Sequence, residues 1–382
     1  MYAQNSTDWQ HAKQHCFKDG FIGSAALAEC RAHKRRKRGN EQGTMLPMNI
    51  VILDDYQDAV RKLDCAAKLD PYQAKVYTNT VKGQGQLAVR LRDADVIVLI
   101  RDRSQITRLL VEKLPKLKLI SQTGRIGSHL DVQACTERGV AVAEGVDSPI
   151  APAELTWALI MAAMRILPQY IGNLKHGAWQ QSGLKSGSMP ANFGLGSVLS
   201  GKTLGVWGYG NVGQLVAGYG KAFGMHVIVW GSELSREKAR KNGYMAAQSR
   251  EDLFAQSDVL SLHLRLSEST RNTVTPSDLA LMKTTALLVN TSHAELIETD
   301  ALIGALNRGH PGMAAVDVFE TEPILQGHAL LRLENCICTP HIGYVEQNNY
   351  EMVFGAAFDN VTNFIKGTPT NIINPGALQV RR

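Results

Sequence analysis

The sequence has few of the features that would place a protein outside the ordinary globular class. It contains no CxxC pair, and its six cysteines are scattered, which argues against a disulfide framework or a zinc site. The most apolar stretch, residues 153–164, includes Glu154 and is much shorter than the about 20 residues of a membrane span. We therefore expect a buried helix there, no membrane association, no bound metal, and small buried thiols in a reducing cytoplasm.

Residues 48–382 also lack a large excess of positive charge. The formal net charge is +6, but residues 1–47 hold eight Lys or Arg against four Asp or Glu, with the basic run KRRKR at 34–38. Four of the six charges thus belong to this segment, which leaves the basic pI as poor support for nucleic-acid binding. The segment is polar and lacks sustained periodicity, and its basic run comes too late for a secretory signal. We expect residues 1–47 to form a disordered basic extension.

From Met48 onward, short apolar strands alternate with helical stretches. The expected strands are residues 49–54, 95–100, 117–121, 140–143, 203–207, 225–230, 258–263, 286–290, 313–317 and 336–339. This alternation is typical of parallel sheets with helices on both faces. A chain of 382 residues with 44% hydrophobic residues has enough apolar material for two cores of ordinary size.

A glycine-rich turn, GYGNVG, follows the strand expected at residues 203–207. In such a turn Gly208 allows a tight exit from the strand, Gly210 lets the backbone approach a pyrophosphate, and Gly213 lets the next helix pack closely. The phosphates would meet the positive end of that helix. With the strand at 225–230 this forms a βαβ unit, which indicates a dinucleotide site. Its turn residues are Gly208, Tyr209, Gly210, Asn211, Val212 and Gly213.

The end of the second strand of this unit bears on which dinucleotide binds. A carboxylate expected there would accept hydrogen bonds from the ribose hydroxyls and repel a 2′-phosphate. Gly231 and Ser232 stand in its place, and Arg236 and other basic residues follow, which slightly favours NADP over NAD. Glu233 argues for NAD, and the basic residues also fit a solvated helix face.

The glycine turn lies past the middle of the chain, so a substantial unit precedes it. We predict an α/β fold of two doubly wound parallel-sheet domains of the Rossmann or flavodoxin-like kind. A dinucleotide-binding domain (148–342) would be inserted into a substrate domain (48–147 and 343–382), with a helix at 345–366 returning to the first domain. The cleft between them is the expected place for a small substrate.

Three chemically active side chains follow the later strands. Asp317, in DVFETEP, and His341, in TPHIG, stand just beyond apolar strands, where open parallel sheets place groups that face ligands. Glu322 follows Asp317 on a loop. A carboxylate beside an imidazole stabilises the imidazolium and fixes its tautomer, which makes an acid and base for work near neutral pH.

The order of motifs from Met48 to the carboxyl end resembles the D-isomer-specific 2-hydroxyacid dehydrogenase family, including its phosphoglycerate dehydrogenases and glyoxylate or hydroxypyruvate reductases. The matching segments are RDRSQIT at 101–107, TGRIGSHLD at 123–131, the helix around Glu154, GYGNVG, SLHL at 261–264, LVNTS at 288–292, DVFETEP and TPHIG. The resemblance implies hydride exchange between a nicotinamide and a small 2-oxo or 2-hydroxy acid, with His341 as acid and base and Glu322 as its partner. It also implies a homodimer.

Further contacts follow from the resemblance and from the position of the residues. It implies that Ser232, His263, Thr291, Asp317 and Gly343 border the cofactor. The substrate carboxylate would meet a segment made of Thr123, Gly124, Arg125 and Ile126. Arg101, Arg103 and Arg125 are candidates for binding a second anionic group, although surface arginines are common. Trp179, Phe193 and Tyr344 could shape an apolar pocket or simply pack in the core.

One position departs from the family pattern. After LVNTS the family has an arginine that grips the carboxylate and polarises the reacting carbonyl, but this chain has His293. Histidine lacks the planar, permanently charged fork of arginine. We therefore expect weakened turnover. Two interpretations remain open: a dehydrogenase impaired at His293, or an NAD(P)(H)-sensing binding protein comparable to the co-repressor relatives of the family.

Overall fold

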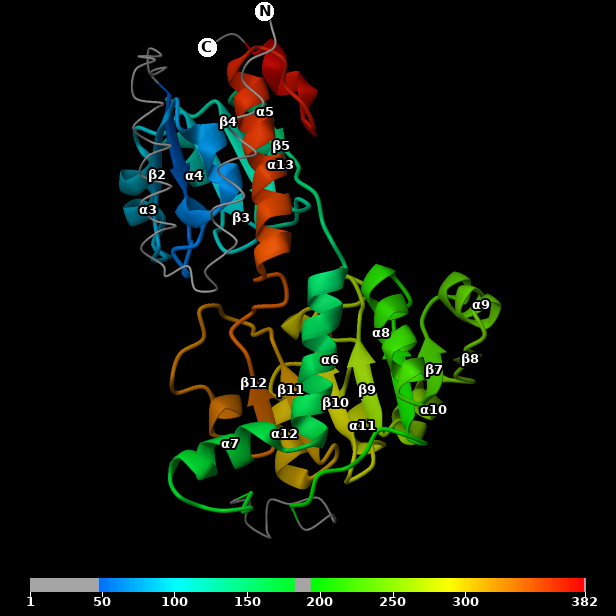
Figure 1. Ribbon diagram of the computed structural model, residues 1–382. Helices are drawn as coiled ribbons and strands as arrows, with labels where there is room; N and C mark the ends of the chain where they lie inside the picture. Colours follow the sequence, from blue (N-terminus) through cyan, green and yellow to red (C-terminus); the bar gives the residue numbers. More distant parts are fainter. Residues whose placement is uncertain (1–47, 183–193, 381–382) are drawn as a thin grey trace, which may run out of the picture.

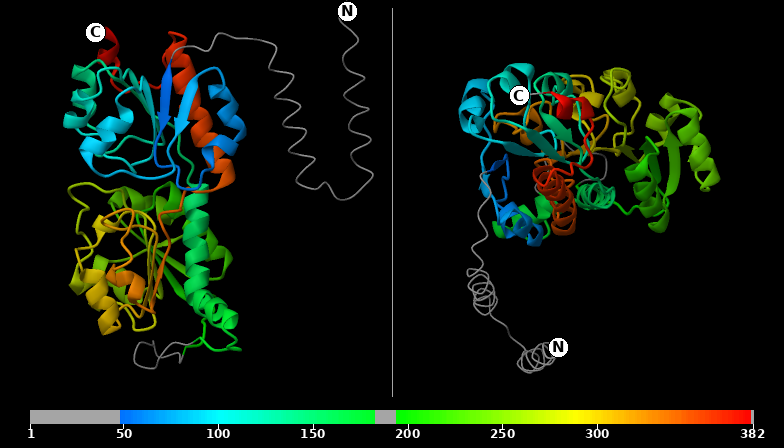
Figure 2. Two further views of the ribbon diagram at one scale, coloured as in Figure 1. Left: turned by 90° about the vertical axis from the view of Figure 1, so that its left-hand side faces the viewer. Right: turned by 90° about the horizontal axis from the view of Figure 1, so that it is seen from above.

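The computed structural model describes residues 48–182 and 194–380. The expected extension at residues 1–47 and the candidate pocket residue Phe193 lie outside these ranges. The described chain forms two lobes stacked one above the other, each built around a central sheet (Figures 1 and 2). In both sheets every strand pair is parallel.

The first lobe contains a five-stranded sheet in the order β2-β1-β3-β4-β5. Its strands are β1 (Asn49–Ile52), β2 (Gln73–Val76), β3 (Val96–Ile100), β4 (Leu119–Thr123) and β5 (Ala141–Ala143). Its helices are η1 (Val60–Lys62), η2 (Asp64–Leu69), α3 (Gln84–Leu91), α4 (Arg108–Glu112), α5 (Val132–Glu137), α13 (Gln347–Ile365) and η6 (Pro375–Gln379). This strand order is that of flavodoxin-like sheets.

The second lobe contains a seven-stranded sheet in the order β12-β11-β10-β9-β6-β7-β8. Its strands are β6 (Thr203–Trp207), β7 (His226–Trp230), β8 (Met245–Ala246), β9 (Val259–Leu262), β10 (Leu287–Asn290), β11 (Met313–Val316) and β12 (Cys336–Cys338). Its helices are α6 (Ile150–Met164), α7 (Leu167–Lys175), α8 (Asn211–Ala222), α9 (Glu233–Lys241), α10 (Arg250–Gln256), α11 (Pro276–Ala280), η4 (Ala294–Leu296), α12 (Ala301–Arg308) and η5 (Ala329–Arg332). The strand order reverses between β6 and β9, which is the crevice where Rossmann sheets bind dinucleotides.

Both sheets are covered on both faces, because nearly all their strand residues are apolar and need burial on each side. In the first lobe α13 covers one face with Phe354 and Phe358, while α3, α4 and α5 cover the other. In the second lobe α6 and α8 lie on one face, and α10, α11 and α12 on the other. The predicted α/β class with two doubly wound sheets is confirmed.

Two chain segments connect the lobes (Figure 1). One runs from β5 to α6, and the other runs from β12 to α13, which returns to the first lobe as predicted. The apolar stretch predicted as a buried helix forms most of α6, which packs into the second core. Among the described residues no single helix is long and apolar enough to cross a membrane; α6 and α7 meet that test only jointly, as a pair bent by 65°.

The cysteines are less buried than predicted. Cys135 is buried, but Cys65, Cys336 and Cys338 are only half-buried, and all four are free thiols. Strand β12 explains two of these positions, because it is the edge strand of its sheet and has a neighbouring strand on one side only. The described residues include no group of three or more His, Cys, Asp or Glu side chains arranged for a metal ion.

Candidate active site

The predicted site residues lie where parallel strands end. In the second lobe, Gly208 follows β6, His263 follows β9, Thr291 follows β10, Asp317 follows β11, and His341 lies three residues after β12. In the first lobe, Arg101 follows β3 and Gly124 follows β4. The guanidinium carbon of Arg101 lies 4.9 Å from the centre of the Tyr344 ring, whose centre is 5.4 Å from that of His341. The two sheets therefore bring their carboxyl ends to a common region.

The glycine turn has the backbone geometry that each glycine requires. Gly208 has φ = +100°, and a Cβ built there would lie 2.5 Å from the carbonyl oxygen of His263. A Cβ on Gly213 would collide with the carbonyl oxygen of Gly208. A Cβ on Gly210 would meet nothing within 4 Å, so this residue faces open space at the start of α8. The turn is thus closed on the protein side and open on the side where a pyrophosphate would approach.

The other turn residues contribute little through their side chains. Asn211 and Val212 are the first residues of α8. Tyr209 is buried, and its hydroxyl accepts a hydrogen bond from Asn242 Nδ2 at 3.0 Å, which directs the ring away from the turn. Any contact of Tyr209 with a cofactor would therefore involve its backbone.

The region after β7 carries the groups that would meet the adenosine ribose. Ser232 caps α9 and accepts a hydrogen bond from the Ser235 amide at 3.3 Å. Glu233 pairs with two arginines: its carboxylate lies 2.5 Å from Arg236 Nη2 and 3.1 Å from Arg240 Nη1. The buried Nε of Arg236 has no hydrogen-bond partner in the described structure. Glu233, the acid that favours NAD, is therefore already paired with the basic side chains.

His341 and Glu322 form the closest acid and imidazole pair of the site. His341 Nδ1 lies 2.6 Å from Glu322 Oε2, and Glu322 Oε1 accepts a hydrogen bond from the Phe319 amide at 3.0 Å. Burial alone would lower the pKa of His341, but the hydrogen bond and charge of Glu322, with the charges of Asp102 and Asp317, raise it above its usual value. The imidazole is therefore held in a protonated form at a higher pH than a free histidine.

Asp317 holds the turn that carries His341. Its buried carboxylate accepts hydrogen bonds from Thr339 Oγ1 at 2.6 Å and from the amides of Ile342 and Gly343 at 2.9 Å each. Burial raises the pKa of Asp317, and these three donors offset part of that rise. His341 itself has φ = +50°, a left-handed conformation that needs such support. The carboxylate of Asp317 thus acts on the backbone of the turn in this structure.

His293 lies within electrostatic reach of His341, Asp102 and Arg101. Burial lowers the pKa of His293, and the charges of Asp102 and Glu295 do not compensate, partly because His341 and Arg101 oppose them. His293 is therefore neutral near pH 7. Its backbone is fixed by Asn290, whose Nδ2 donates to the His293 carbonyl at 2.8 Å.

The segment after β4 presents backbone groups to the same region. Thr123 Oγ1 accepts from the Arg101 amide at 3.1 Å, which joins the ends of β3 and β4. The Ile126 amide donates to Glu144 Oε1 at 2.9 Å. Of residues 124–126, as the structure describes them, Gly124 and Arg125 have amides without a hydrogen-bond partner. The Arg125 side chain is exposed.

Two other predicted cofactor residues have partners within the second lobe. His263 Nε2 lies 2.9 Å from Ser261 Oγ, and burial lowers the pKa of His263 to about 4, which keeps it neutral. Thr291 Oγ1 lies 2.7 Å from Thr156 Oγ1 of α6. Both residues stand at the carboxyl edge of the sheet. His263 is next to the glycine turn because β9 and β6 are adjacent, and Thr291 is one strand further away, after β10.

Sequence reasoning missed three polar groups of the site. Asp102, two residues after β3, is exposed and lies within electrostatic reach of His341 and His293. The surrounding protein would raise its pKa, but the charges of His341, Arg101 and His129 lower it. Behind the Gly124 segment, His129 Nε2 lies 2.6 Å from Gln122 Oε1, and Gln122 Nε2 donates to the Arg125 carbonyl. Asp102 could have been found from its place at the end of a strand, whereas the pairing of Gln122 with His129 has no sequence signal.

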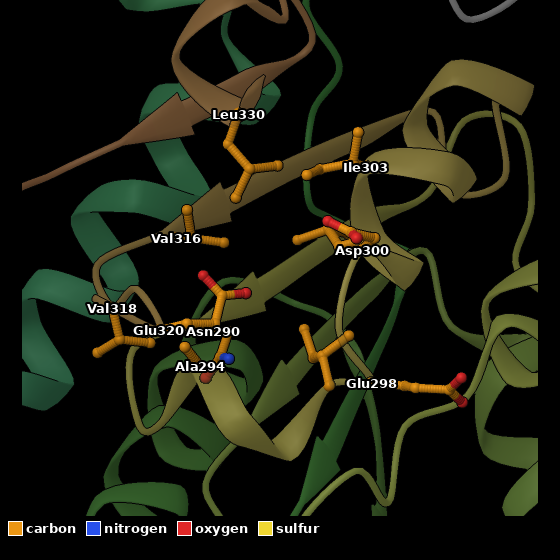
Figure 3. Close-up of a pocket in the computed structure, with 11 residues that line it drawn as sticks. Asn290, Ala294, Glu298, Asp300, Ile303, Val316, Val318, Glu320 and Leu330 are labelled. Carbon is orange, nitrogen blue, oxygen red and sulfur yellow. The ribbon is translucent and has the colours of Figure 1, made fainter. Parts of the chain in front are cut away.

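A separate pocket lies behind the loop that carries His293 (Figure 3). The space among its lining residues is about 360 Å³ and includes open solvent, so the pocket is shallow. Glu298, Asp300 and Glu320 line it together with apolar side chains such as Val316 and Leu330. None of the predicted site residues lines this pocket, so it is distinct from the region around His341.

The turn at Gly208 fits a dinucleotide, since its outer side is open and the free amides of α8 begin there. A protonated imidazole is held at the same sheet edge. Hydride transfer to a carbonyl requires a proton at the oxygen while the hydride arrives at the carbon, and this edge offers both positions. By class, the chain is a nicotinamide-dependent oxidoreductase that acts on CH–OH groups.

Comparison with known proteins gives the family. Residues 157–343 match the model of the D-isomer specific 2-hydroxyacid dehydrogenase, NAD binding domain. The glyoxylate reductase of Aeropyrum pernix is 36% identical over 317 residues, which cover 82% of this chain and 90% of that protein. The chain belongs to the D-isomer-specific 2-hydroxyacid dehydrogenase family.

Solved structures agree with this assignment. A Ralstonia solanacearum structure named for D-3-phosphoglycerate dehydrogenase is 62% identical, with a TM-score of 0.85, and the match covers 87% of this chain and 98% of that one. The D-lactate dehydrogenase of Aquifex aeolicus, solved with NAD and lactic acid, is 29% identical with a TM-score of 0.69, covering 85% and 99% of the two chains.

Proposed function

We propose that this enzyme interconverts a small 2-oxo acid and its D-2-hydroxy acid, at a rate limited by His293. The hydrogen bond of 2.6 Å between His341 and Glu322 is the observation that supports this proposal most strongly. A sensor that only binds NAD(P)(H) has no need of an imidazole with a raised pKa. In this proposal residues 148–342 bind the dinucleotide, and residues 48–147 with 343–382 bind the acid.

His341 is the proton donor and acceptor of the proposed reaction. In the direction of reduction, the protonated imidazole donates to the oxygen of the 2-oxo group, and Glu322 stabilises the positive charge until the proton leaves. In the direction of oxidation, the neutral imidazole takes the hydroxyl proton. The nicotinamide, when bound, supplies or accepts the hydride. Asp317 keeps His341 in place through the Ile342 and Gly343 amides.

The substrate carboxylate would bind to the amides of Gly124 and Arg125 and to the side chain of Arg101. Arg101 Nη1 lies 2.7 Å from Asp147 Oδ1, and both groups border Gly124. A substrate carboxylate would therefore compete with Asp147 for the guanidinium of Arg101. His293 would offer a single neutral donor to the carbonyl oxygen, in place of a charged fork.

A direct assay tests the proposed function. Oxidation of NADPH and of NADH would be followed with glyoxylate, hydroxypyruvate and pyruvate, alongside a titration of cofactor affinity by fluorescence. We expect slow but measurable turnover with at least one of these acids. Tight cofactor binding without any oxidation of either nucleotide would contradict the proposal and would favour the sensing protein.

NADP is the cofactor that we favour within this proposal. Ser232 caps α9, the helix that follows β7, and Arg236 and Arg240 lie on that helix. A 2′-phosphate placed there would compete with Glu233 for the guanidinium groups of Arg236 and Arg240. The guanidinium of Arg236 is fixed over the Trp230 ring, 4.6 Å from its centre, which pre-orients the donor.

Replacement of this arginine should separate the two cofactors. We expect Arg236→Gln to weaken NADPH binding about tenfold or more and to leave NADH binding nearly unchanged, because one charge-assisted hydrogen bond is worth about 1.5–3 kcal/mol. Lys241→Gln, in the last turn of the same helix, is the matched control for a lost positive charge. If fluorescence titration shows that the affinities for NADPH and NADH fall equally, Arg236 does not bind the 2′-phosphate.

The partner that we propose is a second copy of the chain, bound through α7. No residue of α7 is buried, yet Leu167, Ile171 and Leu174 form an apolar stripe along it with exposures of 43%, 54% and 56%. Their spacing of four and three residues places them on one face of the helix. A self-complementary apolar stripe of this kind suits the interface of a twofold dimer.

A charge within this stripe should abolish the dimer. We expect the parent protein to sediment as a dimer and Ile171→Glu to sediment as a monomer, since a buried unpaired carboxylate is costly. Leu109→Glu is the control, because Leu109 is 66% exposed on α4, in the other lobe. A parent protein that sediments as a monomer, or a dimer that survives Ile171→Glu, would contradict this interface.

A further inference from the structure

Two cysteines stand side by side on the strand that leads to His341. Cys336 and Cys338 alternate with Ile337 on β12, so their side chains share one face of the sheet. Their sulfur atoms are 3.7 Å apart, and both residues are half-buried. The two thiols therefore contact each other at the edge of the seven-stranded sheet.

The same strand continues directly into the site. Cys338 is the register partner of Val316, and the next residue, Thr339, donates to the Val316 carbonyl through its amide at 2.9 Å. The Thr339 side chain donates to Asp317, the carboxylate that fixes the His341 turn. A change in the length or position of β12 would therefore act on Asp317 and His341 through a single residue.

The contact between the thiols makes them chemically unequal. The hydrogen bond between the two sulfur atoms lowers the pKa of the Cys338 thiol, although burial opposes this effect. The same contact, with burial, raises the pKa of Cys336 well above its usual value. Two neighbouring thiols share one proton in this way, since the remaining S–H donates to the thiolate. We assign Cys338 as the nucleophile and Cys336 as the thiol beside it, an order that the single replacements described below test.

We propose that Cys336 and Cys338 form a reversible oxidation site for hydroperoxides. The Cys338 thiolate attacks the O–O bond and becomes a sulfenic acid, while the other oxygen leaves as an alcohol or as water after taking up a proton. Cys336 then attacks the sulfur of Cys338 and displaces its hydroxyl as water, which closes a disulfide within the chain. The two thiols lose two electrons and two protons, and the hydroperoxide is reduced by two electrons.

The geometry makes this disulfide easy to reduce again. Residues two apart on an extended strand have Cα atoms about 6.6 Å apart. This is at the upper limit of the range of about 4.4–6.8 Å that a disulfide spans, so β12 must contract locally to close the bond. An edge strand can do this more easily than a central one, because only one neighbour, β11, holds it in the described sheet. Bonds with such strain have high reduction potentials and are reopened by ordinary thiols. Contraction would also displace Thr339, and with it the support of His341.

Peptide mapping after peroxide treatment tests the site. Hydrogen peroxide would be added to the full chain, followed by alkylation and trypsin, which cuts after Arg332 and Lys366 and leaves both cysteines in one peptide. We expect this peptide to be unalkylated and lighter than its reduced form by two hydrogen atoms, and we expect dithiothreitol to reverse the change. A peptide that stays fully alkylatable under conditions that oxidise Met352, or a disulfide to any other cysteine, would overturn the proposal.

Single replacements assign the two roles. In Cys336→Ser the Cys338 sulfenic acid should persist and be trapped by dimedone, whereas Cys338→Ser should give no adduct at Cys336. Cys65→Ser is the control, because burial and Glu351 raise the pKa of the half-buried Cys65 thiol to about 12. It should leave the disulfide unchanged. Trapping at Cys336 in Cys338→Ser would contradict the assignment of the nucleophile.

The link to the active site has its own measurement. Oxidation should lower turnover about tenfold or more in the parent, since small displacements of a catalytic group are costly, and reduction should restore it. The double variant Cys336→Ser/Cys338→Ser should be unaffected by peroxide. Disulfide formation without loss of turnover would overturn this link alone, whereas the mass result is independent of the proposed function.

Discussion

His293→Arg should raise the kcat/KM of the enzyme for 2-oxo acids by about 10²–10³-fold, because it supplies a preorganised donor aimed at charge that develops in the transition state. In the parent, burial lowers the pKa of His293, so the side chain that should stabilise this charge is neutral at pH 7. Arginine stays charged and can bind the carboxylate and the carbonyl oxygen at once. Asp102 faces this position and would stabilise the new charge.

The measurement is a kinetic comparison with glyoxylate and hydroxypyruvate, and His293→Lys is the matched control. Lysine restores a positive charge without the planar fork, so it should recover only part of the rate. A parent that is as fast as His293→Arg across these acids would show that the chain has compensated for His293. Arg101, already within electrostatic reach of His293, would then be the first residue to examine.

Much of the fold could be predicted because strands buried on both faces leave a strong apolar signal. The predicted bounds of the strand at 203–207 are the same as those of β6. The predicted ends of the other nine strands differ from the observed ends by at most about two residues. Strands β2 and β8 were missed. Residues 73–76 of β2 are mostly exposed and polar, and β8 has two residues, so neither has an apolar pattern to detect. Their positions come from pairing with β1 and β7.

The candidate site could likewise be predicted only in part. Residues that follow strands, such as Asp317 and His341, could be placed because parallel strands put their carboxyl ends on one edge. The directions of side chains could not be predicted from motifs. Tyr209 belongs to the glycine turn, yet its hydroxyl accepts a hydrogen bond from Asn242 at the end of α9. The same holds for Asp102, whose influence on His341 arises only when the two lobes come together.

The partnership of His341 with Glu322 makes the strongest test of the proposed chemistry. Glu322→Gln keeps the shape of the side chain but removes the charge that stabilises the imidazolium. We expect kcat to fall about 10²-fold or more, since a positioned general acid contributes about 10²–10⁴-fold. Glu320→Gln is the matched control: Glu320 lies two residues away and faces His328 at 3.6 Å, so its loss should leave turnover unchanged.

The pH dependence separates this role from a structural one. Reduction of a 2-oxo acid needs His341 protonated, so its rate is full below the pKa of His341 and falls as the pH rises through it. Glu322 raises that pKa in the parent. In Glu322→Gln the burial of His341 is no longer opposed by this charge, so the pKa drops and the fall in rate begins at lower pH. Oxidation needs the neutral imidazole, so its rising limb should move to lower pH by the same amount. A lower rate with both limbs unmoved would mean that Glu322 only holds the loop.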